Sequence, residues 1–308
     1  FSKRLSLNGF KRQRQTDASL IRIYFRYICV QNRSMYTEYQ PSHLLVPYID
    51  SYWEFKGNPD YGMRIHILPD GCTDFIFTLG EVANAVEEGS LIMQPYRSYF
   101  VGPMTKYSEL VTYTESIHMF GVRFLPCGLS CFTNLPLHEF VNSRVSTNEM
   151  KAVFDDTFIE KLGEQKHVTD RIRVVEEYLL AYLARHYQPA DSHVAMAVNM
   201  INHSKGKRSV RSLMDDVCLC QRHFERKFKH YTGFTPKEYS RIVKFKNAVE
   251  LLRTTTSANL LTTAVDAGYY DLAHFSKEIK SMSGNTPASF LSLTVPEETT
   301  LTYIEPQR

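Results

Sequence analysis

Residues 220–228 read CQRHFERKF, and residues 271–279 read DLAHFSKEI. Each segment is followed, at the same distance, by a Gly-x-Thr-Pro sequence, at 233–236 and at 284–287. The offset between the two copies is 51 residues throughout. A constant offset over such a stretch indicates a duplicated supersecondary unit.

Each copy has the pattern of a helix, a turn and a second helix. In the first copy, apolar residues at the i, i+3, i+4, i+7 spacing predict a short amphipathic helix: Val210, Leu213, Met214 and Val217. The turn is expected at Cys218, after which Phe224 and Phe228 face inward on the second helix. In the second copy Gly268 supplies the turn and Asp271 occupies the helix N-cap.

The outer faces of both second helices are mostly basic or hydrogen-bonding. The first face carries Gln221, Arg222, Glu225, Arg226 and Lys229. The second carries Ala273, His274, Ser276, Lys277 and Lys280. A short helix with such a face, presented by a tight turn on another helix, fits a DNA major groove.

This pattern resembles the AraC/XylS family of transcription regulators, whose C-terminal domain has two helix-turn-helix units joined by a long helix. The resemblance rests on Gly-Tyr-Tyr-Asp at 268–271, His-Phe at 274–275 and the repeated Gly-x-Thr-Pro, and it implies that 237–253 is the joining helix. Two departures weaken the first unit. Cys218 stands where the family has a turn Gly, and Cys220 where it has a Ser or Thr cap, and a thiol is a poor cap.

The resemblance implies that the two recognition helices enter successive major grooves, about 34 Å apart. The predicted base-reading residues are Gln221, Arg222, Glu225, Arg226, Leu272, Ala273, His274, Ser276 and Lys277. Arg222 and Arg226 each have the donors for a guanine edge. The predicted phosphate contacts are His223, Lys229, Lys244, Lys246 and Lys280. For His223 and His274, bracing of the helix is the alternative.

Charge is distributed unevenly along the 308 residues. The net charge is only +3, but residues 1–34, 35–202 and 203–308 carry +7, −9 and +5. Because DNA is a polyanion, an acidic middle beside a basic C-terminal part indicates that only the latter approaches phosphate. No apolar run approaches the length of a membrane span, so we expect no contact with a membrane.

None of the six cysteines forms a Cys-x-x-Cys pair. A structural zinc site needs two such pairs or an equivalent with histidines, so we expect no metal, no cofactor, and free thiols in a reducing cytoplasm. A metal-responsive regulator is a third hypothesis, and it would use Cys127, Cys131, Cys218 or Cys220.

The region after residue 35 is rich in β-branched and aromatic residues separated by Gly and Pro turns. Six short strands are expected, at 52–55, 64–68, 74–79, 98–101, 110–113 and 118–124. This spacing predicts a small, cupin-like β-barrel. Residues 68–75 (LPDGCTDF), with 101–103 and GVRF at 121–124, resemble the N-terminal domain of one subgroup of AraC-type regulators, which implies a sensory or dimerising role.

Helices are expected after residue 126, at 147–162, 169–186 and 191–203. The middle helix has excess apolar surface, so it either packs back on the barrel or pairs with its copy in a second subunit. The expected fold class is α+β: a small N-terminal β-barrel with helices, then an all-α domain of two helix-turn-helix units. The expected divisions are 1–34, a basic arm or non-native leader; 35–190, the sensory domain; 191–208, a linker helix and hinge; 209–291, the DNA-binding domain; and 292–308, a tail.

Aromatic and charged residues of the barrel form a candidate effector pocket. They are Trp53, Arg64, His66, Phe75, Phe77, Tyr99, Tyr113 and Arg123. Aromatic residues in a β domain commonly just fill its core, which is the alternative. Metal-dependent cupin enzymes present His-x-His, whereas residues 64–66 read RIH, so we expect no enzyme.

The sequence thus predicts a cytoplasmic, sequence-specific transcription regulator, of the activator type, that binds double-stranded DNA. Its expected partners are a promoter or operator, RNA polymerase, a small-molecule effector and a second copy of itself. The alternative is a cupin-like small-molecule-binding protein or enzyme without a DNA role. The outward-pointing basic residues of the duplicated helices favour the regulator.

Overall fold

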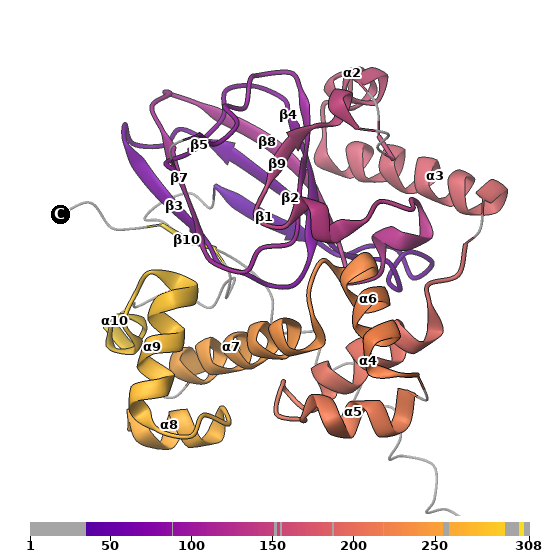
Figure 1. The fold of residues 1–308 in the computed structure, drawn as a ribbon. Coiled ribbons are helices and arrows are strands. Elements are labelled where there is room, and N and C mark those ends of the chain that lie inside the picture. Colours follow the sequence, from indigo (N-terminus) through magenta and orange to yellow (C-terminus); the bar gives the residue numbers. More distant parts are fainter. Residues whose placement is uncertain are drawn as a thin grey trace, which may run out of the picture.

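The computed structural model describes residues 35–87, 89–150, 153–154, 156–186, 188–217, 219–254, 259–292 and 302–304. A β-rich domain with helices on one side lies above a layer of helices formed by the C-terminal part of the chain (Figure 1). The long helix α7 (Pro236–Thr254) runs along the boundary between the two (Figure 1). This arrangement confirms the predicted α+β class with a β-rich N-terminal and a helical C-terminal domain.

Two antiparallel sheets build the N-terminal domain. The first has the order β1-β2-β8-β4-β6-β9, with strands Tyr36–Tyr39, Ile49–Gly57, Ile117–Phe124, Thr73–Thr78, Ser98–Val101 and Arg144–Ser146. The second has the order β10-β3-β7-β5, with strands Thr302–Ile304, Met63–Ile67, Ser108–Thr112 and Asn84–Ala85. All strand pairs are antiparallel, so each face of the first sheet collects alternate residues.

The alternation gives the first sheet two buried faces. Ile76 and Tyr99 point between the two sheets, where they join a core with Trp53 and Met119. The intervening residues, such as Phe75, point the other way into a second core shared with the helices. A sheet covered on both faces explains why its strands read as nearly continuous apolar runs.

Two helices cover the outer face of the first sheet. They are α2 (Asp156–Gly163) and α3 (Val168–His186). Val175 and Leu179 of α3 are completely buried in the sheet-facing core, so the apolar stripe of this helix packs back on the barrel. The helix predicted at 147–162 is shorter than expected. Residues Thr147–Glu149 form only a 3-10 turn (η3), because strand β9 just before them is held in the sheet by β6.

The C-terminal domain contains α4 (Ser192–His203), α5 (Val210–Val217), α6 (Gln221–Thr232), α7, α8 (Leu260–Asp266), α9 (Leu272–Ser283) and α10 (Pro287–Ser292). The helix α4, expected in a linker, instead joins this core: Val194, Ala197 and Ile201 are completely buried in it. The Asp191 side chain caps α4 through the backbone N–H groups of His193 and Val194.

The two domains are in contact along α7. Lys246 Nζ donates to the carbonyl of Asp70 at 3.2 Å. The backbone at Gly71 (φ +86°) approaches so closely that a methyl group on it would lie 2.7 Å from Cε2 of Tyr239. Leu68 and Cys127 of the β domain are buried in the helical core. Among the described residues, no helix is long and apolar enough to cross a membrane.

Candidate nucleic-acid interface

The duplication seen in the sequence is matched by equivalent hydrogen bonds at the C-terminal ends of α6 and α9. Thr232 Oγ1 donates to the carbonyl of Phe228 at 2.7 Å, and 51 residues later Ser283 Oγ donates to the carbonyl of Ile279 at 2.7 Å. A Gly in the left-handed region then ends each helix, with φ +83° and +75°. Only Gly adopts this conformation without strain, so both copies stop at the same point.

The N-terminal ends of the two helices differ. At α9 the Asp271 carboxylate accepts from the His274 backbone N–H at 2.7 Å. At α6 the N-cap residue is Cys220, whose side chain makes no capping hydrogen bond. This absence agrees with the expectation that a thiol is a poor cap. The turn residue Cys218 lies outside the described residues.

The predicted base readers of α6 lie on one open face. Gln221, Arg222 and Arg226 are exposed, while Phe224 and Phe228 are completely buried beneath them. The Gln221 amide donates to the Glu225 carboxylate at 2.8 Å, across one turn. The exposed side of α6 therefore presents the hydrogen-bond donors of Gln221, Arg222 and Arg226, as the spacing predicts. His223 is half-buried beside them.

The corresponding face of α9 is equally open but less charged. Leu272, Ala273, His274 and Lys277 are exposed, and Ser276 is half-buried. The His274 ring packs edge-on against Tyr269, with ring centroids 5.4 Å apart, which favours a bracing role for this histidine. Just before the cap, Tyr270 is 92 % exposed. Tyr270 is not among the predicted DNA contacts, although it belongs to the Gly-Tyr-Tyr-Asp sequence.

The predicted phosphate contacts fall into two groups. Lys229 and Lys280 are exposed on the recognition helices. In contrast, Lys244 Nζ donates to the Gly268 carbonyl at 3.2 Å and lies over the Tyr269 ring, and burial lowers its pKa. Lys246 is directed at the N-terminal domain. In this arrangement each of the two lysines of α7 donates to a backbone carbonyl and is half-buried, and their contact with phosphate stays a prediction.

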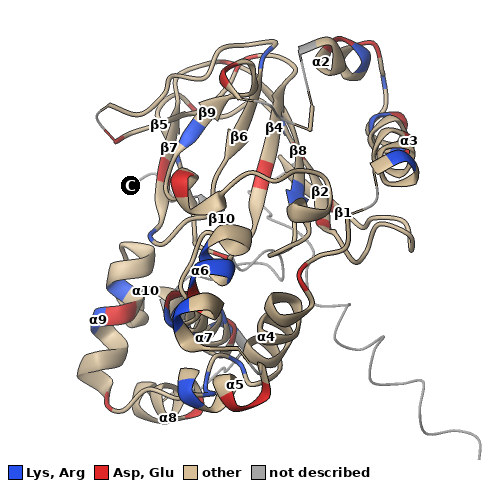
Figure 2. Cartoon of the chain, turned by 45° about the vertical axis from the view of Figure 1, so that its right-hand side comes forward, with Lys and Arg blue, Asp and Glu red and all other residues tan. Residues whose placement is uncertain are grey.

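The separation of the two units is set by α7. Thr235 and Glu238 form a reciprocal capping box at its start: the Glu238 carboxylate accepts from the Thr235 backbone N–H at 2.7 Å, and Thr235 Oγ1 accepts from the Glu238 N–H at 3.1 Å. Arg241 of α7 donates twice to the carboxylate of Glu278 on α9, at 2.9 and 3.0 Å. The joining helix is thus tied to the second recognition helix. Lysines and arginines recur along α5, α6 and α7 (Figure 2).

The candidate effector residues are dispersed. Trp53 and Arg123 meet between the sheets, where both bond to Asp74. Phe75 and Phe77 point away from them, into the core under α2 and α3.

The remaining candidate effector residues are separated as well. Arg64 forms an ion pair with Glu109 at the surface, Tyr113 is exposed, and His66 stacks on Tyr107 with centroids 6.0 Å apart, while Tyr99 is buried between the sheets.

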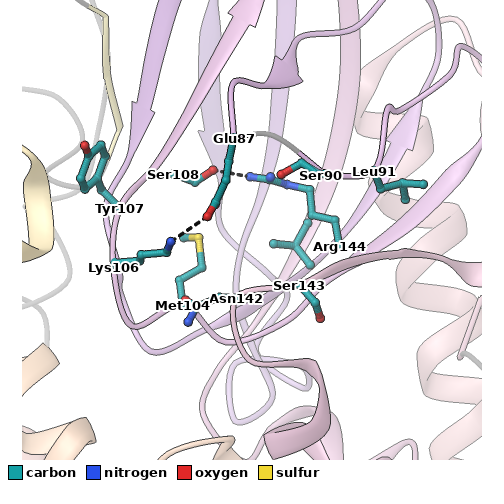
Figure 3. Close-up of a pocket in the computed structure, with 12 residues that line it drawn as sticks. Glu87, Ser90, Leu91, Met104, Lys106, Tyr107, Ser108, Asn142, Ser143 and Arg144 are labelled. Atoms are coloured by element: carbon teal, nitrogen blue, oxygen red, sulfur yellow. Dashed lines mark hydrogen bonds and ion pairs between the residues drawn. The ribbon is translucent and has the colours of Figure 1, made fainter.

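The structure instead shows a cavity that the sequence analysis missed. It lies beside the loop between β6 and β7 and is lined by Glu87, Met104, Lys106, Ser108 and Arg144, among others (Figure 3). Its members come from segments distant in the sequence, and Arg144 stands in a stretch without a motif. The pairing of β9 with β6 brings in Arg144, and the pairing of β5 with β7 brings in Glu87.

Two family matches divide the chain as the fold does. Residues 37–146 match a domain described as "Domain of unknown function (DUF6597)", and residues 213–292 match one described as "Helix-turn-helix domain". No curated protein matches the chain.

Solved structures resemble the chain only distantly. ToxT from Vibrio cholerae is 9 % identical, with a TM-score of 0.47, over 79 % of this chain and 98 % of its own. A probable AraC family transcriptional regulator from Rhodopseudomonas palustris is 20 % identical, with a TM-score of 0.32, over 34 % of this chain and 100 % of its own. The xylose-binding transcription activator xylR is 23 % identical, with a TM-score of 0.32, over 35 % of this chain and 29 % of its own. The helix-turn-helix match spans the two duplicated units and their shared C-terminal caps: the chain carries a helix-turn-helix domain at its C-terminal end and is a DNA-binding transcription regulator.

Proposed function

We propose that α6 and α9 enter successive major grooves on one face of the duplex, with α7 setting their separation. The observation that carries this proposal is the duplication of the C-terminal caps at an offset of 51 residues, because it marks two equivalent helices with open outer faces. A half-site spacing of roughly 34 Å is the geometry that two such units require.

The first helix is the stronger base reader in this proposal. Arg222 and Arg226 offer guanidinium groups for guanine edges, whereas Leu272 and Ala273 on α9 offer only apolar contact to a thymine methyl. Lys229 and Lys280 contact phosphate and position the helices. We therefore expect tighter sequence demands in the half-site that α6 occupies.

Fluorescence anisotropy tests this assignment on the duplex upstream of the chain's own gene and on a shuffled duplex. Arg226→Ala is expected to lose about 1 to 3 kcal/mol on the natural duplex and little on the shuffled one. Lys229→Ala, the matched control on the same helix, is expected to weaken binding to both duplexes. It should also reduce the slope of log K against log salt concentration by about one. Equal losses of affinity for Arg226→Ala on both duplexes would show that Arg226 does not read bases.

The N-terminal domain is proposed as the regulatory part, responding to a small molecule or to a second subunit. Its contact with α7, through Asp70, Gly71 and Lys246, supports a direct influence on the DNA-binding helices. We also propose that the chain acts on RNA polymerase at its promoter and has no catalytic activity of its own.

A further inference from the structure

The cavity beside the β6–β7 loop has the size and the chemistry of a ligand site. Its volume is about 310 Å³, at the lower end of the range for small-molecule pockets. Both charged and apolar side chains line it: Glu87, Lys106 and Arg144, with Leu91, Val101 and Met104. Figure 3 shows Arg144 and Lys106 converging on the same space from the two sides of Glu87.

Among the described residues, Arg144 makes no hydrogen bond to a carboxylate of this cavity, although the charge of Glu87 acts on it. Within the described part of the chain, its guanidinium has one hydrogen-bond acceptor, Ser108 Oγ at 2.7 Å. Burial lowers the pKa of Arg144, and the charge of Glu87 opposes that effect. The Glu87 carboxylate itself is bonded to Lys106 Nζ at 2.9 Å. The Arg144 guanidinium is half-buried and has five N–H donors, and one neutral acceptor leaves most of these donors without a protein partner that the structure describes. The site therefore favours an added anion.

The charged cavity adjoins a mostly apolar one. A second cavity of about 60 Å³ lies between the two sheets and shares Val101, Met104 and Arg144 with the first. Trp53 and Met119 line its inner end. A ligand with an anionic head at Arg144 therefore has room for an apolar body beside Met104, directed toward the barrel interior.

The loop that walls this cavity also touches both DNA-binding units. A methyl group on Gly233, which ends α6, would lie 2.5 Å from Cγ of Pro103, and one on Gly284, which ends α9, would lie 2.7 Å from Cζ of Tyr107. The two glycines are equivalent positions of the duplication. A single loop, residues 102–107, thus contacts the same point on each recognition helix, and Met104 and Lys106 of that loop line the cavity.

We propose that this cavity binds a small organic anion with an apolar body, its carboxylate, sulfonate or phosphate head held by Arg144 and Lys106, and that the 102–107 loop transmits binding to both helix-turn-helix units. The transmission step rests on the proposed regulatory function; the binding step does not. Lys106 turns from Glu87 to the ligand, and the loop that carries it shifts Pro103 and Tyr107 against the ends of α6 and α9.

Two fluorescent probes with the same body test the binding step. Anilinonaphthalene-1-sulfonate carries an anionic head, and N-phenyl-1-naphthylamine lacks it. Arg144→Gln in the full chain is expected to weaken binding of the sulfonate at least tenfold and to leave the neutral probe unchanged, and Arg144→Lys is expected to retain most of the sulfonate binding. Lys161→Gln, an exposed lysine on α2, is the matched control and is expected to change neither. Far-UV circular dichroism verifies that each variant is folded.

The same protein tests transmission. Saturating anilinonaphthalene-1-sulfonate is expected to change the affinity for the natural duplex at least threefold. Pro103→Ala, at a loop residue that contacts the end of α6 and does not line the cavity, is expected to reduce that change while the probe still binds. Sulfonate binding that is absent, or equal in wild type and Arg144→Gln, would overturn the anion site. Selective binding with no change in DNA affinity would overturn transmission alone, and a chain that binds the probe selectively but no DNA would count against the regulator and not against the site.

Discussion

At the scale of single residues, the two recognition helices differ most at their first position. The Asp271 side chain accepts from the His274 backbone N–H, whereas the Cys220 side chain makes no capping hydrogen bond. The Cys220 backbone is nevertheless already extended, at φ −66° and ψ 143°, as an N-cap requires. The weakness therefore lies in the side chain and not in the local conformation.

Cys220→Ser is accordingly expected to stabilise the chain. A hydroxyl in place of the thiol accepts from a first-turn N–H, and the gain in free energy of unfolding is about 0.5 to 1 kcal/mol. Asp271→Ala, the opposite change at the equivalent position, is expected to cost about 1 kcal/mol. Urea denaturation followed by circular dichroism measures both. If only Asp271→Ala shifted the midpoint, the cap of α6 would not limit stability.

At the scale of elements, Asp191 joins two helices. One carboxylate oxygen caps α4, and the other accepts from Lys227 Nζ of α6 at 2.6 Å. Burial alone would raise the pKa of Asp191, but the hydrogen bonds from Lys227 and the Val194 N–H, with the charges of Lys227 and His193, outweigh it and lower the pKa below its ordinary value of 3.8. The folded state thus favours the ionised form.

Asp191→Asn keeps the cap and removes the charge, so it isolates the bond to Lys227. Because the folded pKa is depressed, the stability contributed by ionised Asp191 is complete above pH 3.8 and is lost as the pH falls through the folded value. The difference in free energy of unfolding between wild type and Asp191→Asn should stay constant from pH 7 to about pH 5 and shrink below about pH 4. Asp170→Asn, which breaks the surface pair with Arg173, is the control and should cost little at any pH. A difference that does not vary with pH would contradict this account.

The elements also show what periodicity predicts and what it leaves open. The amphipathic spacing around Phe224 and Phe228, and the cap at Asp271, were enough to predict α6 and α9, because those signals are local. The direction of Phe75 and Phe77 was not predictable, since both faces of β4 are buried and alternation cannot distinguish them. The contacts of Lys244 with Gly268 and of Lys246 with Asp70 were not predictable, because each joins α7 to a segment distant in the sequence.

At the scale of the whole molecule, the same limit applies to domain boundaries. A short helix after Pro189, followed by a basic segment, has the sequence of a linker. In the structure α4 packs against α5, α6 and α7, and Asp191 bonds to α6, so it belongs to the DNA-binding domain. Pro189 alone does not distinguish the end of one core from the start of a hinge.

Two fragments test that boundary. A fragment of residues 190–292 is expected to unfold cooperatively and to bind the natural duplex, because it keeps α4 with its cap. A fragment of residues 204–292 loses the completely buried Val194, Ala197 and Ile201. Burial of each Val or Ile stabilises by about 1.5 to 3 kcal/mol, and a small domain has only about 5 to 15 kcal/mol in all, so the shorter fragment should lack a cooperative transition. Differential scanning calorimetry compares the two fragments. Equal transition temperatures would show that α4 is part of the linker and not of the DNA-binding domain.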